Sequence, residues 1–216
     1  MIGRAFSRRA CRRRTGFPAG ITLCTVLSCI ALLGYGAPQT DASKISRAAA
    51  RRCQAKIDRL LAYAGSAKPE GGQTTQFTDD EVNSYLALET SASYHPSLKS
   101  LWFTFQESTL GCAASIDFDQ IQLSSSQVLN QLLYSMFSGV HLLSLSGTLV
   151  AQEGQAYFRL AGASFDGTKL PNALVEQIIT IVGRSQRPPF DPLKPSEMPY
   201  GIKKVEVHAR SITVFQ

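Results

Sequence analysis

The sequence predicts an α+β fold in which an antiparallel sheet of about six strands packs on helices, preceded by an N-terminal apolar segment and a basic amphipathic helix. Two observations predict this fold. In four segments apolar residues recur at three- and four-residue spacing, as on one face of a helix. These segments are residues 41–64, 79–88, 125–139 and 171–183. Three other segments alternate apolar and polar residues around short turns, the pattern of antiparallel hairpins. They are residues 101–118, 141–165 and 202–216.

The N-terminal segment, residues 1–37, predicts export. Six arginines and no acidic residue lie within the first nineteen positions, and the uncharged run Gly20–Gly36 follows them, which is the order found in secretory signal peptides. An uncleaved N-terminal membrane anchor is the alternative, because the 17 residues of that run are close to the shortest helical span of a bilayer. In both cases the arginines stay in the cytoplasm and the rest of the chain is exported to the periplasm or cell envelope.

The charge distribution argues against a nucleic-acid partner. The formal net charge is +6, but six of the 22 lysines and arginines lie before residue 20, so the remaining 16 balance the 16 aspartates and glutamates. A near-neutral domain does not present the basic surface that phosphate binding needs.

Residues 41–64 predict the basic amphipathic helix. Its apolar stripe comprises Ile45, Ala49, Cys53, Ile57, Leu60 and Ala64. Its basic face comprises Lys44, Arg47, Arg51, Arg52 and Arg59. Two interpretations of this face stay open: it lies against the anionic headgroups of a membrane, or it is the solvated face of a helix that packs by its other side. The composition of residues 65–73 predicts a linker. The expected units are therefore residues 38–75, the helix with its linker, and residues 76–216, an α+β domain.

Three consecutive carboxylates, Asp79, Asp80 and Glu81, raise the question of a catalytic or metal-binding cluster. Thr78 and Glu81 have the spacing of a capping box, in which a hydroxyl and a carboxylate satisfy backbone amides at a helix start. Asp79 and Asp80 then lie in the first turn, where the helix dipole favours negative charge. A helix N-terminus accounts for all three carboxylates without catalysis.

Two helices carry broad apolar faces, and these faces are the candidate site. Their expected cavity-lining residues are Leu129, Leu132, Leu133, Met136, Phe137, Leu174, Ile178 and Val182. Faces this broad are buried on two sides or line a cavity, and pockets for small molecules are mostly apolar. Core packing under a sheet explains the same pattern, so the residues alone leave both possibilities open.

Neither a metal site nor catalytic machinery is expected, and no cofactor is predicted. His95, His141 and His208 are scattered without ligand spacing, and His141 is interpreted as a hydrogen-bonded strand residue. Asp117 and Asp119 resemble the pair of an aspartate-nucleophile phosphotransferase, but the hairpins predict antiparallel pairing in place of the parallel sheet that this chemistry uses.

After the N-terminal segment the chain contains two cysteines, Cys53 and Cys112. Two thiols in an oxidising compartment are able to form a disulfide, but small buried apolar side chains are the favoured interpretation.

The order of the elements and several short motifs resemble a known family. The motifs are Glu81-Val82-Asn83 through Leu86, Gly147-Thr148-Leu149, Leu170-Pro171 and Pro199-Tyr200-Gly201-Ile202. Over residues 76–216 the chain is similar to bacterial envelope proteins of the LmeA-like phospholipid-binding family, and more remotely to the tubular lipid-binding (TULIP) superfamily. The resemblance implies a curved antiparallel sheet that wraps around helices and holds acyl chains in an apolar interior.

The expected function is therefore non-catalytic binding or carriage of a phospholipid or other acyl-chain ligand in an apolar cavity. The expected partners are that ligand and a membrane surface, which the N-terminal segment and the basic helix contact. The alternative is a membrane-anchored structural or interaction protein that has no ligand cavity.

Overall fold

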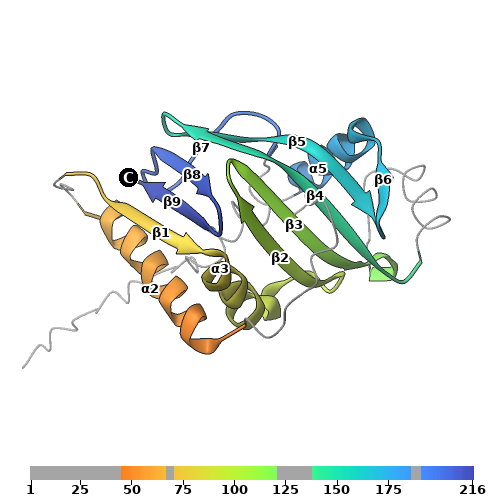
Figure 1. The fold of residues 1–216 in the computed structure, drawn as a ribbon, viewed down its shortest axis with the longest axis horizontal. Helices are drawn as coiled ribbons and strands as arrows, with labels where there is room; N and C mark the ends of the chain where they lie inside the picture. Colours follow the sequence, from red (N-terminus) through yellow and green to blue (C-terminus); the bar gives the residue numbers. More distant parts are fainter. Residues whose placement is uncertain (1–44, 67–70, 121–137, 186–190) are drawn as a thin grey trace, which may run out of the picture.

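The computed structural model describes residues 45–66, 71–120, 138–185 and 191–216. Within them the chain forms two antiparallel sheets and several helices, so the predicted α+β class is confirmed (Figure 1). The larger sheet, here called the main sheet, is curved and has six strands. In Figure 1 it fills the right of the view, while the smaller second sheet and two helices fill the left.

The main sheet contains two of the three predicted hairpins. Its strands are β2 (Leu98–Gln106), β3 (Thr109–Asp117), β4 (Val140–Gln152), β5 (Gln155–Phe165) and β6 (Thr168–Leu170), with β7 (Ser196–Glu197) paired to β5. The turn between β4 and β5 consists of Glu153 and Gly154, with φ of 54° and 78°. A two-residue turn with both residues left-handed matches the twist of the strands that it joins.

The third predicted hairpin does not join the main sheet, which corrects the expectation of a single sheet. β8 (Lys204–His208) and β9 (Ser211–Phe215) form the second sheet together with β1 (Thr74–Thr78). β1 pairs with β9 so that Phe77 lies opposite Ile212. The sequence did not predict β1, because its five residues follow directly on a linker composition and run into a helix. The boundary expected between residues 75 and 76 therefore falls inside a strand.

The two sheets meet because β8 crosses the tips of both long hairpins. The Ser108 amide, in the β2–β3 turn, donates to the Val207 carbonyl at 3.1 Å. The Gly154 amide, in the β4–β5 turn, donates to the Lys203 carbonyl at 2.9 Å. These bonds place the apolar faces of the two sheets around one hydrophobic core, which includes residues from both sheets and from the helices.

Helix α2 (Arg47–Ala64) is the predicted basic helix, although it begins at Arg47 and not at Asp41. Ser46 caps it by accepting a hydrogen bond from the Ala49 amide at 3.1 Å. Of the predicted stripe, Ala49, Cys53, Ile57 and Leu60 are buried, whereas Ala64 at the helix end is exposed. The helix packs on α3 and β1 as part of the same core.

Helix α3 (Asp79–Tyr85) has the predicted capping box between Thr78 and Glu81, which is confirmed. It continues into a π-helical turn, η2 (Leu86–Thr90), and a 3-10 turn, η3 (Ser91–Ser93). A further 3-10 turn, η4 (Phe118–Gln120), follows β3, and α5 (Asn172–Ser185) follows β6. The helix expected over residues 125–139 lies, up to residue 137, outside the described residues, as does the N-terminal segment. In the part of the chain that the structure describes, no helix is long and apolar enough to cross a membrane.

Candidate functional site

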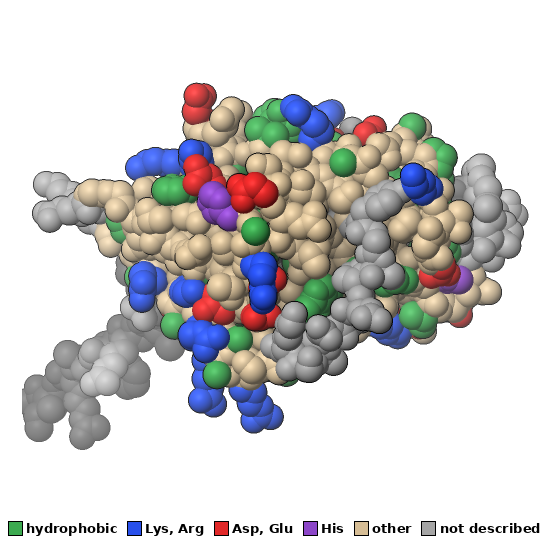
Figure 2. Space-filling model, in the orientation of Figure 1, with side chains coloured by type: hydrophobic (Ala, Val, Ile, Leu, Met, Phe, Trp, Pro, Cys, Tyr) green, Lys and Arg blue, Asp and Glu red, His purple; other side chains and the backbone are tan. Residues whose placement is uncertain are grey.

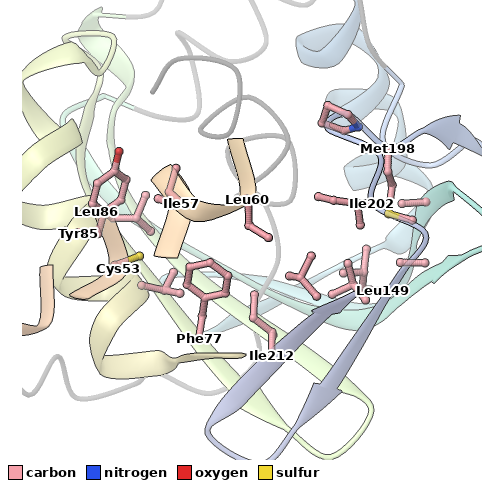
Figure 3. Close-up of a pocket in the computed structure, with 16 residues that line it drawn as sticks. Cys53, Ile57, Leu60, Phe77, Tyr85, Leu86, Leu149, Met198, Ile202 and Ile212 are labelled. Atoms are coloured by element: carbon pink, nitrogen blue, oxygen red, sulfur yellow. The ribbon is translucent and has the colours of Figure 1, made fainter. Parts of the chain in front are cut away.

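An apolar pocket is enclosed by the helices α2 and α3, by the second sheet and by the tip of the β4–β5 hairpin (Figure 3). Its volume is about 100 Å³ and it is partly open to solvent. Its lining comprises Cys53, Ile57, Leu60, Phe77, Val82, Tyr85, Leu86, Leu149, Ala151, Ala156, Met198, Pro199, Ile202, Val205, Ile212 and Val214. In Figure 3 the labelled side chains from the helices lie opposite those from β4 and the segment before β8.

One wall of the pocket comes from helix periodicity. Cys53, Ile57 and Leu60 are spaced four and three residues apart, so they share the inner face of α2. Val82, Tyr85 and Leu86 share the inner face of α3 and η2 in the same way. These side chains are at most 7% exposed. Because all of them are buried, we call this wall the floor of the pocket.

The opposite wall comes from strand alternation. In the second sheet Phe77, Ile212 and Val214 project from the face that meets the helices. In the main sheet Ala151 and Ala156 are directly paired across the β4–β5 hairpin and both line the pocket. Two opposing methyl side chains leave space that larger side chains would occupy. The small size of these two side chains therefore adds to the space in the pocket.

The Gly147-Thr148-Leu149 motif has a packing role in this wall. Leu149 lines the pocket, and its cross-strand partner Phe158 is buried. The ring of Phe158 lies over Gly147, where a Cβ atom would overlap both that ring and the Arg159 carbonyl. Glycine at this position therefore leaves room for the ring of Phe158 beside the pocket.

The segment before β8, residues 191–203 and here called the connector, closes one side of the pocket and is held by backbone bonds. The Met198 amide donates to the Gly154 carbonyl at 2.7 Å, and the Ile202 amide donates to the Pro199 carbonyl at 3.2 Å. Tyr200 and Gly201, between them, have φ of 61° and 67°. The Pro199-Tyr200-Gly201-Ile202 motif is thus a hydrogen-bonded turn at the pocket wall.

Gln216 fastens the connector to α2. Its side-chain amide donates to the Tyr200 carbonyl at 2.7 Å and to the Leu60 carbonyl at 3.1 Å. Its side-chain oxygen accepts from the Gln73 amide group at 3.0 Å. The side chain is buried, so these bonds exchange little with water. They fix the width of the pocket between Leu60 and the connector.

Glu81 fastens α2 to α3. Its two carboxylate oxygens lie 3.1 Å from Arg52 Nε and 2.6 Å from Lys56 Nζ, and its side chain is only 5% exposed. Burial by itself raises the pKa of Glu81, but hydrogen bonds from Lys56, the Thr78 amide and Arg52 outweigh it, so the pKa lies below its ordinary value. Glu81, the third of the three consecutive carboxylates, therefore completes the capping box of Thr78 at the start of α3 and also forms ion pairs with α2.

The two residues that follow Val82 fasten α3 to its other neighbours. Asn83, which is 1% exposed, donates to the Phe103 carbonyl and accepts from the Phe103 amide, each at 2.7 Å. The adjacent Ser84 hydroxyl accepts from the Ser46 amide at 3.1 Å. The Glu81-Val82-Asn83 motif thus positions α2, α3 and β2 around the floor of the pocket.

Of the residues expected to line a cavity, only Leu174 has a described side chain, and it does not line this pocket. Leu129, Leu132, Leu133, Met136 and Phe137 lie outside the described residues. Leu174 is on α5 and is 42% exposed. Ile178 and Val182 are also in α5, but their side chains lie outside the described ones. A cavity between the two predicted apolar helices stays a prediction.

The sequence contains one signal for the pocket, the apolar stripe of α2. Periodicity alone predicts this stripe only as the packing side of a separate basic helix. Its role in the pocket depends on the second sheet, whose pairing of β1 with β9 joins distant parts of the chain.

The polar residues weighed as catalytic groups have structural partners. His141, in β4, has its Nδ1 2.6 Å from Asp166 and its Nε2 2.9 Å from the Ser138 carbonyl. The Asp166 bond is the main cause that raises the pKa of His141. Two acceptors favour the imidazolium form, which has no lone pair to act as a base. Asp117 lies 3.1 Å from Lys99 Nζ.

Cys53 and Cys112 are both buried, the first at the floor of the pocket and the second in β3. Among the described residues, no group of histidine, cysteine, aspartate and glutamate side chains is arranged to hold a metal ion.

Comparison with known proteins adds no assignment. No protein-family model, no curated protein and no solved structure matches the chain. The likeness to LmeA-like and tubular lipid-binding proteins therefore stays a prediction, and the chemistry of the pocket is the basis for assigning a function.

Proposed function

We propose that the protein is a non-catalytic lipid-binding protein of the cell envelope, and that the apolar pocket takes an acyl chain of a phospholipid or similar ligand. The observation that carries the proposal is the pocket lining. Only the Tyr85 hydroxyl and the Cys53 thiol supply polar side-chain atoms among its residues. A cavity with so few polar partners does not retain ordered water, and burial of a hydrocarbon chain contributes about 0.8 kcal/mol per methylene.

The exposed charge of α2 supports contact with a membrane surface. Arg47, Arg51 and Arg59 are exposed, whereas Arg52 and Lys56 bind Glu81. Figure 2 shows lysine and arginine side chains that project from the lower edge of the molecule, where α2 lies in Figure 1. Each basic residue near an anionic bilayer contributes about 1 kcal/mol. The arginine-rich, apolar N-terminal segment, which precedes α2 in the sequence, would hold the domain at the same surface.

Photoactivatable lipid tests the proposal. The full chain is expressed in bacteria whose membranes contain phospholipids with a diazirine at various acyl-chain positions. After illumination, the labelled peptides are mapped by mass spectrometry. We expect labels on pocket residues such as Ile57, Leu149 and Ile212. A protein whose pocket peptides carry no label from any of these lipids does not have the proposed function.

The Ala156→Leu substitution supplies the matched variant. Its three added carbons fill the pocket, and filled cavities commonly stabilise a protein by about 0.5–2 kcal/mol. We expect a folded protein whose pocket is not labelled. Ala163→Leu is the control: Ala163 lies in the same strand, is 2% exposed and does not line the pocket. Overpacking there lowers the free energy of unfolding by about 1–3 kcal/mol, and the labelling is retained.

A second candidate is a membrane-anchored interaction protein without a ligand. The small volume of the pocket, about 100 Å³, favours this candidate, since most of the core around it is packed. This second candidate predicts that Ala156→Leu does not change the photolabelling of the protein by membrane lipids. The arginines of α2 would then contact a protein partner, and a crosslinker on Arg51→Cys would capture that partner and not lipid.

A further inference from the structure

The volume of the pocket limits what it can hold. A cavity of about 150 Å³ lined by leucine, isoleucine and phenylalanine accommodates benzene, which has six carbons. In proportion, the present cavity of about 100 Å³ takes about four carbons. A phospholipid acyl chain is several times longer. The whole chain therefore does not fit in this pocket as the described residues form it.

We propose that the pocket holds only the methyl end of a single acyl chain, while the rest of that chain and the headgroup stay outside in the lipid surface. This inference rests on the proposed function and specifies its ligand. Under this proposal the protein binds a lipid that stays in a membrane surface, and it does not carry a lipid through water.

The walls of the pocket do not offer room for the remaining carbons. On one side α2 is tied to α3 by the Glu81 contacts with Arg52 and Lys56. On the other side the connector is tied to α2 through Gln216 and to the β4–β5 turn through Met198. Widening the pocket would break polar contacts of the buried Glu81 side chain on one side or of the buried Gln216 side chain on the other, and a buried polar group is expensive to leave without its partner.

The orientation of the chain follows from the lining. A carboxylate, phosphate or ester inside the pocket would lose its hydration and find no charged partner among the residues that line it. The methyl end of the chain has no polar group to satisfy. The chain therefore enters methyl end first, and the polar end stays where water and the headgroups are.

The limited depth also sets the strength of binding. For a chain end that leaves water, each methylene inside the pocket raises the affinity about fourfold, which corresponds to about 0.8 kcal/mol, so about four carbons raise it on the order of 250-fold. A chain end that leaves the bilayer interior gains little of this, because lipid tails are already apolar. If the protein pulled the lipid out of the bilayer, the part of the acyl chain outside the pocket would be exposed to water, which opposes release. While the lipid stays in the membrane surface, other lipids surround that part of the chain.

Position-specific photolabelling of the full chain in bilayer vesicles of phosphatidylglycerol and phosphatidylethanolamine tests the inference. Three probes carry the diazirine next to the chain terminus, at mid-chain or next to the carbonyl. We expect the terminal probe to label peptides that contain Ile57, Leu149 or Ile212. The other two probes should label these peptides no more than the Ala156→Leu background, while Ala163→Leu should keep the pattern of the unmodified chain.

The remaining outcomes separate the inference from the function on which it rests. Equal labelling of the pocket by terminal and mid-chain probes means that the whole chain enters, which overturns the inference and leaves lipid binding intact. Absence of pocket labelling by all three probes overturns lipid binding itself. Native mass spectrometry gives an independent reading: a lipid retained on the protein after extraction from the membrane contradicts chain-end binding, and its loss agrees with it.

Discussion

The two ends of the main sheet are held together in different ways. At the hairpin-tip end, which borders the pocket, the polar contacts centre on buried side chains: Asn83 is 1% exposed, and the Glu81 side chain is 5% exposed although its partners Arg52 and Lys56 are 60% and 27% exposed. At the opposite end, His141 contacts Asp166 with side chains that are 23% and 49% exposed, and its ring lies 4.7 Å from that of Phe165. A contact that water cannot replace is worth more, so the pocket end is expected to be the more rigid end.

Removing Asn83 should have the largest effect. In Asn83→Ala both the amide and the carbonyl of Phe103 lose their partner in a buried place. An unsatisfied buried group costs about 1–3 kcal/mol, so with two such groups we expect the free energy of unfolding to fall by about 2–6 kcal/mol in urea titration. Asn172→Ala in α5, at an exposed site, is the control and should change it by less than about 0.5 kcal/mol. A similar loss of unfolding free energy in both variants would show that the two ends of the main sheet do not differ in how strongly they are held.

Glu81→Gln should have an intermediate effect that depends on pH. Because the pKa of Glu81 is lowered by folding, its contribution is complete above the unfolded value of about 4.5 and disappears as the pH falls through the folded value. At pH 7 we expect a loss of about 1–3 kcal/mol. The wild type and the variant should converge in thermal melts toward pH 3. A constant difference at every pH would show that the charge of Glu81 is not the cause, and Glu89→Gln, at an exposed position, controls for net charge.

The opposite end should respond least, and with the opposite sign. Asp166 raises the pKa of His141, so this contact stabilises fully below the unfolded value of about 6.5 and loses its effect as the pH rises through the folded value. We expect a slight fall in Tm from pH 6 to pH 8 that is absent in His141→Gln. An equal fall in that variant would assign the pH dependence to other groups.

Local patterns predicted most of the elements. The three hairpins, the capping box at Thr78 and the α2 stripe depend on residues a few positions apart, and each is present. Alternation and helical spacing are set by the backbone itself, which is why they can be seen in a single sequence.

The second sheet and the pocket depend on contacts that local patterns do not contain. β1 pairs with β9 across most of the chain, and Phe77 faces the pocket only because of that pairing. Gln216 reaches Leu60 and Tyr200, and neither partner follows from spacing. The volume of the pocket depends on Ala151 lying opposite Ala156, two residues that periodicity counts as ordinary apolar positions.

The contact between Asn83 and Phe103 also bears on how the protein avoids association with itself. β2 is an end strand in the order of the main sheet, and end strands present open amide and carbonyl groups on which further chains can pair and fibrils can grow. At Phe103 both groups are already bonded to a side chain of the same molecule. On the lipid surface that we propose for this protein, copies would meet often, and the bonds of Asn83 to Phe103 leave no open backbone group at that position for a further strand to pair with.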